Sequence, residues 1–158
     1  MKIPVSDKKF DPAPEGLFQA VCVDFIDRGM LPDKFSGDMK HKADIVFELE
    51  EKNPATGKPF RTMKRFNLTL AERSNLRKFL EAWRGKRFTD EALKEFDTDS
   101  LLGVNCQLQI THNVDGEGRV RDSISAIIPV RGDMVLLRPS PDYIRHQDRD
   151  GNTQPEPF

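Results

Sequence analysis

The stretch from Lys58 to Phe88 gathers the residue types that hold phosphates and stack on flat rings. It contains ten Lys or Arg residues against two Glu residues, whereas the whole 158-residue chain has a net charge of −1. Cations beside flat rings are the combination with which proteins bind single-stranded nucleic acid. The interleaved aromatic residues are Phe60, Phe66, Phe79, Trp83 and Phe88. This local polarisation predicts a polyanionic partner, although the net charge does not.

The candidate phosphate contacts lie at the two ends of this stretch, in a basic strand and after a helix. If the strand alternates, its two arginines share one face and its lysine lies on the other. The candidates are Arg61, Lys64, Arg65, Lys86 and Arg87. A second interpretation stays open, because Glu48 and Glu50 on the neighbouring strand could pair with the two arginines and simply stabilise the hairpin.

Candidate base-stacking rings lie in a long connection and at the basic exit of the helix. The segment Arg28–His41 is expected to be a loop, since it contains two glycines and a proline. A loop of this length is either a linker or a binding element. Within it, Lys34 stands beside Phe35, whose ring could stack on a base or fold back onto the protein. Phe88 is the second candidate ring.

Catalytic patterns are few. Asp33 followed by Glu50-Glu51-Lys52 matches the bare residue pattern of a metal-dependent nuclease, which requires these groups to converge on one metal ion. The chain has no nucleophile elbow, zinc quartet or Gly-rich phosphate loop. We therefore predict a non-enzymatic protein without a cofactor or metal. The nuclease stays as one alternative, and a non-catalytic protein-interaction module of a replication complex as another.

The expected elements form an all-β domain with an inserted helix. Alternating patterns predict five strands, and a stripe from Leu76 to Trp83 predicts a helix with a capping box at Thr69 and Glu72. A short second helix is expected after Thr89. The strands are expected at 16–27, 42–51, 59–68, 104–114 and 119–130. With both helices between the third and fourth strands, this is the order of a five-stranded OB-fold-like Greek-key barrel. A split β-sandwich is the competing architecture.

The predicted organisation has three parts. Residues 1–15 are an extended arm, 16–130 are the barrel, and 131–158 are a Pro-rich surface segment with a flexible tail. The sequence contains no apolar run long enough to span a membrane, and its first residues lack the apolar core of a signal peptide. Cys22 and Cys106 belong to no C-x-x-C pair, which favours two buried, reduced thiols in the cytoplasm.

The segments 64–70, 77–93 and 101–106, together with the opening Pro14-Glu15-Gly16, resemble small phage and prophage replication proteins of the OB-fold single-stranded-DNA-binding type. The resemblance spans residues 14–130. It implies coating of single-stranded DNA without sequence readout, in phage replication or recombination inside a bacterial host cell. The last residues, Pro157 and Phe158, resemble the C-terminal tips of such proteins, which implies recruitment of replication or recombination partners. Neither the oligomeric state nor the number of nucleotides covered follows from the sequence.

Overall fold

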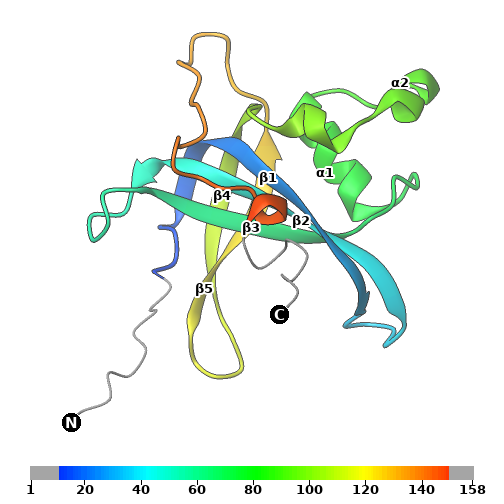
Figure 1. The fold of residues 1–158 in the computed structure, drawn as a ribbon, viewed down its shortest axis with the longest axis horizontal. Coiled ribbons are helices and arrows are strands. Elements are labelled where there is room, and N and C mark those ends of the chain that lie inside the picture. The colour runs from blue at the N-terminus through cyan, green and yellow to red at the C-terminus, as the bar shows by residue number, and fades with distance from the viewer. Residues whose placement is uncertain (1–10, 150–158) are drawn as a thin grey trace, which may run out of the picture.

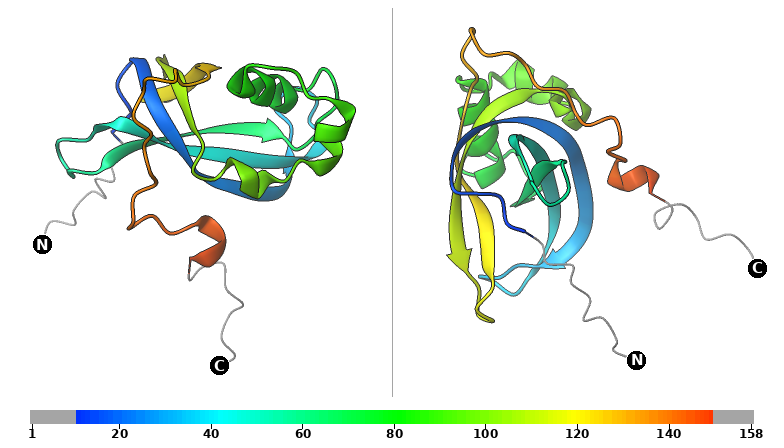
Figure 2. Two further views of the ribbon diagram at one scale, coloured as in Figure 1. Left: turned by 90° about the horizontal axis from the view of Figure 1, so that it is seen from above. Right: turned by 90° about the vertical axis from the view of Figure 1, so that its left-hand side faces the viewer.

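The computed structural model describes residues 11–149, and Pro157 and Phe158 lie outside this range. Its five strands form one antiparallel sheet in the order β3-β2-β1-β4-β5. The strands are β1 (Gly16–Pro32), β2 (Met39–Lys52), β3 (Pro59–Asn67), β4 (Asn105–Val114) and β5 (Val120–Ile128). The sheet curls on itself (Figure 2). The predicted OB-like barrel with helices between β3 and β4 is confirmed.

The barrel closes where β3 approaches β5. Across this seam the Thr62 hydroxyl donates to Asp122 Oδ1 at 2.8 Å, and Lys64 Nζ donates to the Ile124 carbonyl at 3.1 Å. Side chains therefore hold together two strands that are not neighbours in the hydrogen-bonded order of the sheet.

The interior is filled by the inward-facing residues of all five strands and by one face of α1 (Asn75–Arg84). Phe47 from β2 packs against Phe79 and Trp83 of the helix. The centroid of its ring lies 6.2 Å from that of Phe79 and 5.4 Å from that of Trp83. The Trp83 indole N–H donates to the Asn105 carbonyl at 2.9 Å, so its one polar atom is satisfied. The stripe from Leu76 to Trp83 is core, as its spacing predicts.

The start of α1 differs from the prediction. The N-cap is Ser74, whose hydroxyl accepts from the Arg77 N–H, and not Thr69. The Thr69 hydroxyl accepts from the Ala71 N–H two residues on, which makes a local turn ahead of the helix. At the other end, Gly85 has φ = 75° and supplies the left-handed cap. The short α2 (Asp90–Glu95) begins after Thr89, as predicted.

The β1–β2 connection is a hairpin and not the long loop expected over Arg28–His41. β1 continues to Pro32 and β2 begins at Met39, so only residues 33–38 connect them. The β1–β2 and β4–β5 hairpins extend on the same side of the barrel, away from α2 (Figure 1). Together they flank one side of the molecule.

Residues 11–15 are held against the barrel. Ala13 is buried, its N–H donates to Asp122 Oδ2 at 2.8 Å, and the His112 ring lies 2.6 Å from its carbonyl oxygen. At the other end, residues 131–149 leave β5 and cross the outside of the barrel, with the 3-10 turn η2 (His146–Asp148) lying in front of the sheet (Figure 1). We call residues 131–149 the strap. Among residues 11–149, no helix is long or apolar enough to cross a membrane.

Candidate nucleic-acid interface

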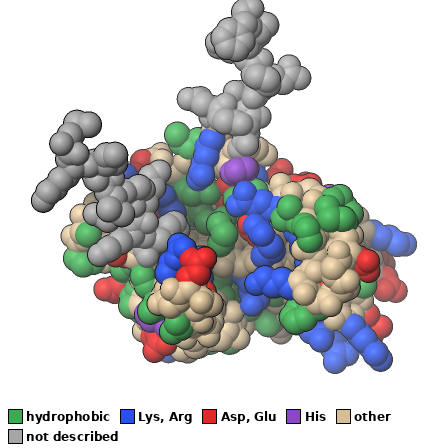
Figure 3. Space-filling view, turned by 90° about the horizontal axis from the view of Figure 1, so that it is seen from below, with side chains coloured by type: hydrophobic (Ala, Val, Ile, Leu, Met, Phe, Trp, Pro, Cys, Tyr) green, Lys and Arg blue, Asp and Glu red, His purple; other side chains and the backbone are tan. Residues whose placement is uncertain are grey.

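The outer face of β1, β2 and β3 carries charged residues, among them Arg28, Arg61 and Arg65. Seen from the side to which the hairpins point, Lys and Arg side chains gather across the middle of the surface (Figure 3). In OB-like barrels this is the region with which oligonucleotides are bound.

Arg65 stands on this outer face beside a buried carboxylate. Its guanidinium donates to both oxygens of Asp44, at 2.8 and 3.0 Å, and Arg28 from β1 donates to Asp44 Oδ2 at 2.7 Å. Burial raises the pKa of Asp44, but the hydrogen bonds from Arg65 and Arg28 outweigh it and lower the pKa. Two cations thus share one carboxylate, and the cluster keeps a net positive charge facing solvent.

Arg61 is also paired, with the acidic partner that the hairpin interpretation named. Its Nε lies 3.0 Å from Glu48 Oε2, and the Glu48 side chain is buried. Its guanidinium also lies over the ring of Tyr143 in the strap, 4.8 Å from the centroid. Arg61 therefore combines a structural ion pair with a stacking contact.

Phe35 and Lys34 lie in the turn of the β1–β2 hairpin. The Phe35 side chain is 98% exposed and does not fold back onto the barrel. Asp33 builds the turn, because its carboxylate accepts from the Phe35 and Ser36 N–H groups and pairs with Lys42 Nζ at 2.7 Å. The hydrogen bond from Lys42 is the main cause of its lowered pKa. A flat ring is thus presented to solvent on a hydrogen-bonded turn.

The remaining candidates do not join this face. Lys64 points to the β3–β5 seam, where its ammonium group is bound to the Ile124 carbonyl. Phe88 is 8% exposed and packs edge-on against Phe96, so its ring is part of the core and not a free stacking surface. Lys86 and Arg87 are exposed, and the segment between α1 and α2 to which they belong lies on the side of the barrel opposite the hairpin tips (Figure 1).

The strap covers much of the outer face, which sequence reasoning did not anticipate. Under it lies a second apolar cluster, against which Leu137 and Tyr143 pack; its members are Val21, Val23, Ile26 and Val46. Leu137 exchanges two hydrogen bonds with the Asn105 side chain, at 2.8 and 2.9 Å, and the Ser140 N–H donates to Glu48 Oε1 at 2.7 Å. The apolar residues on both faces of β1 are the signal in the sequence that something covers this side.

Asp24, buried in β1, is the main polar anchor of the strap. Its carboxylate accepts from the Tyr143 hydroxyl at 2.8 Å, the Arg145 guanidinium at 3.1 Å and the His146 N–H at 2.8 Å. Burial raises the pKa of Asp24, but these three donors outweigh it and lower the pKa below its ordinary value. The ionised form of Asp24 therefore stabilises the attached strap.

This anchor predicts acid sensitivity. Because the pKa of Asp24 is lower in the folded protein than in the unfolded chain, its contribution is complete above the ordinary Asp value of 3.8 and is lost as the pH falls through the folded-state pKa. Urea unfolding of the wild type and Asp24→Asn should therefore differ at pH 7 and converge in acid. An equal difference at pH 7 and pH 3 would contradict this role of the charge.

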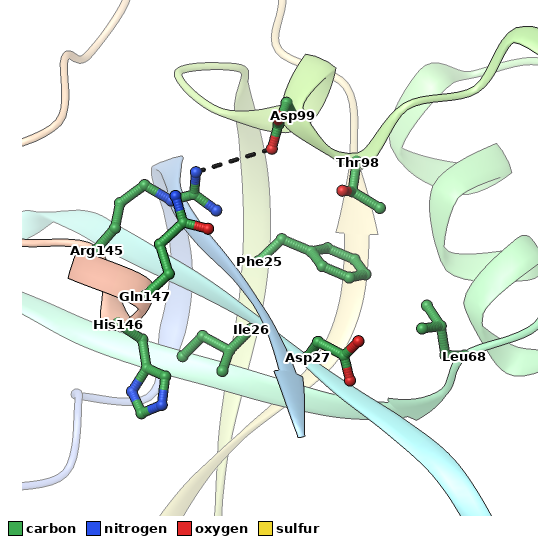
Figure 4. Close-up of a pocket in the computed structure, with 9 residues that line it drawn as sticks. All are labelled: Phe25, Ile26, Asp27, Leu68, Thr98, Asp99, Arg145, His146 and Gln147. Carbon is green, nitrogen blue, oxygen red and sulfur yellow. Dashed lines mark ion pairs between the residues drawn. The ribbon is translucent and has the colours of Figure 1, made fainter. Parts of the chain in front are cut away.

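A pocket of about 480 Å³ lies where the strap meets β1 and the 3-10 turn η1 (Thr98–Leu101). Phe25 and Leu68 line it on the barrel side, while Arg145 of the strap reaches toward Asp99, with Nη1 and Oδ1 3.8 Å apart (Figure 4). Since the strap supplies one wall, the shape of this pocket depends on the strap staying in place.

The residues of the nuclease pattern do not converge. Asp33 precedes β2 and Glu50 lies near its other end, eleven residues or about 35 Å along the strand from Met39. In the described range 11–149, no group of three or more His, Cys, Asp or Glu side chains is arranged to hold a metal ion. Cys22 and Cys106 are buried free thiols; burial is the main reason that the pKa of Cys22 is raised to about 12.

The arrangement is one face of an OB-like barrel with shared ion pairs, an exposed ring at one hairpin tip and a peptide strap across the middle. A comparison of the chain with protein-family models finds no matching family, and a search of curated proteins finds no match either.

Proposed function

We propose that the protein binds single-stranded DNA without sequence readout, along the outer face of β2 and β3 between its two hairpins. The observation that carries this proposal is the combination of the Arg28–Arg65–Asp44 cluster on that face with the fully exposed ring of Phe35 at its edge. Guanidinium groups bind phosphates, and an exposed ring stacks on any base.

The kinds of group on this face favour binding without sequence readout. Arginines contact the phosphates, which are the same at every nucleotide, and Phe35 offers a flat surface that does not distinguish bases by hydrogen bonding. The resemblance of the sequence suggests phage replication or recombination in a bacterial cell as the setting, with Pro157 and Phe158 as the contact for protein partners.

Lys86 and Arg87 form a separate basic pair in this proposal. Because they lie after α1, away from the outer face, only a longer strand that bends around the barrel would reach them. Short oligonucleotides are therefore expected to depend on the β3 arginines and Lys34, and not on the pair after α1.

Binding of a short oligo-dT should weaken with salt. Two neutralised phosphates, at Lys34 and Arg65, give a slope of about −1.4 for the logarithm of affinity against the logarithm of salt concentration, or about sevenfold weaker binding for a fourfold rise in salt, and each further phosphate contact adds about −0.7 to the slope. Fluorescence titration with a labelled strand measures it.

Lys94→Ala, which removes an exposed charge from α2, is the matched control and should leave the slope unchanged. Absence of binding at low salt would overturn the proposal, as would binding that salt does not weaken. Loss of the strand in the presence of Mg²⁺ would favour a nuclease instead.

A further inference from the structure

Two neighbouring residues of the strap, Asp142 and Tyr143, contact side chains at the start of β3. These contacts differ in kind from the other anchors of the strap. The Asp142 carboxylate lies 3.0 Å from Lys58 Nζ, and the Tyr143 ring lies against the Arg61 guanidinium, 4.8 Å from its carbon to the ring centroid. Arg149 also lies over this ring, at 5.6 Å. An anionic group on a lysine is thus followed directly by a flat ring on an arginine.

This pair of contacts has the chemistry of a bound nucleotide. A phosphate would take the place of the carboxylate on Lys58, and a base would take the place of the phenol ring on Arg61. Lys58 is 61% exposed and Asp142 is 50% exposed, so a strand can reach this ion pair from solvent. Arg61 and Arg65 lie on the same face of β3, so this ion pair and ring contact adjoin the proposed DNA-binding face.

We propose that Lys58 and Arg61 form a nucleotide subsite, which Asp142 and Tyr143 occupy as long as no strand is bound. The proposal rests on the single-stranded-DNA binding proposed above and deepens it. An incoming nucleotide would exchange with Asp142 and Tyr143, and this part of the strap would leave the face.

The exchange has a cost that sets the apparent affinity. Removing Tyr143 breaks its hydrogen bond to buried Asp24 and uncovers part of the apolar cluster beneath it. A base laid over the same aliphatic side chains would cover them again. Because only molecules with an open subsite bind there, the apparent dissociation constant is the intrinsic one divided by the open fraction.

A substitution that weakens the contacts of Asp142 or Tyr143 with the subsite should therefore tighten DNA binding. Asp142→Ala removes the carboxylate from Lys58 without touching a buried group, and it is expected to raise the affinity for oligo-dT about three- to tenfold. The matched control is Asp133→Ala, which removes the same charge from an exposed position of the strap, where Asp133 pairs with the neighbouring Arg131. Equal effects of the two variants would overturn the subsite, since both change the long-range field alike.

A double-mutant cycle between Lys58 and Asp142 tests whether the two residues act through the same contact. Lys58→Ala should weaken binding and reduce the salt slope by about 0.7, since it removes one phosphate contact. In that background Asp142→Ala should no longer raise the affinity, because the group with which its carboxylate competes is gone. A full Asp142→Ala gain without Lys58 would contradict the exchange.

Tyr143 is the only tyrosine of the chain, which allows the strap to be observed directly. Fluorotyrosine incorporated into the full-length protein gives one ¹⁹F signal, from the ring that lies on Arg61. With saturating oligo-dT, this signal is expected to move toward its position in the urea-unfolded protein. If oligo-dT binds but the signal does not move in this direction, the subsite is contradicted and the proposed function is not. If oligo-dT does not bind at all, both proposals are contradicted.

Discussion

Replacing Arg28 and Arg65 together with alanine is expected to lower the free energy of unfolding by about 3–5 kcal/mol. The double replacement leaves Asp44, which is fully buried, without either of its cationic partners. Each single replacement should cost only about 1 kcal/mol, since the other guanidinium still compensates the charge and both arginines are partly exposed to solvent. Urea unfolding at pH 7 measures all three variants.

A triple variant that adds Asp44→Asn is the control for this prediction. It removes the buried charge as well as its partners, so most of the lost stability should return. A double variant as stable as the wild type would show that Asp44 is not held ionised by these arginines. The single variant Arg65→Ala then remains folded and can be used to measure the contribution of Arg65 to strand binding.

Phe35→Ala is expected to weaken the binding of oligo-dT by about 5- to 150-fold, since stacking of one base on an aromatic ring is worth about 1–3 kcal/mol. The same change should leave stability nearly unaltered, because the side chain is 98% exposed and contributes almost nothing to the core. Fluorescence titration and urea unfolding of the same preparation separate the two effects.

Phe35→Tyr and Phe35→Leu are the matched controls for the ring. Tyrosine keeps a flat face and should preserve binding, whereas leucine keeps the apolar volume without the ring and should behave like alanine. Wild-type affinity in Phe35→Leu would mean that the hairpin tip contributes no stacking, and the role of Phe35 in the proposal would be abandoned.

The ion pairs of β3 show how far pairing can be read from the chain. The sequence placed Arg61 and Arg65 on one face and named Glu48 and Glu50 as their possible partners. Glu48 does pair with Arg61, but Arg65 pairs with Asp44. In an antiparallel hairpin, four residues forward along β3 correspond to four residues backward along β2, which leads from Glu48 to Asp44 and not to Glu50.

The β1–β2 hairpin differs from the loop that its turn residues predict, and the reason is related. Gly29 and Pro32 are turn signals in isolation, but Gly29 lies opposite Lys42 and Pro32 opposite Met39 in a continuing ladder. Strand pairing that starts in the barrel continues outward through residues with low intrinsic β-strand propensity, because tertiary context outweighs local propensity. The tip then falls on Asp33, whose side chain stabilises the turn.

The local pattern of the chain determined the order of the strands, the helix with its buried stripe and the barrel that follows from them. These features depend on alternation, turn residues and caps, which act over a few residues. Only the tertiary structure decided which charges remain available for a ligand, because that depends on contacts between distant segments. Tyr143 and Arg145 reach Asp24 across about 120 residues of chain and cover the face that the basic strand was expected to leave open. No periodicity in residues 131–149 encodes that docking, since its partners are single buried groups on other strands.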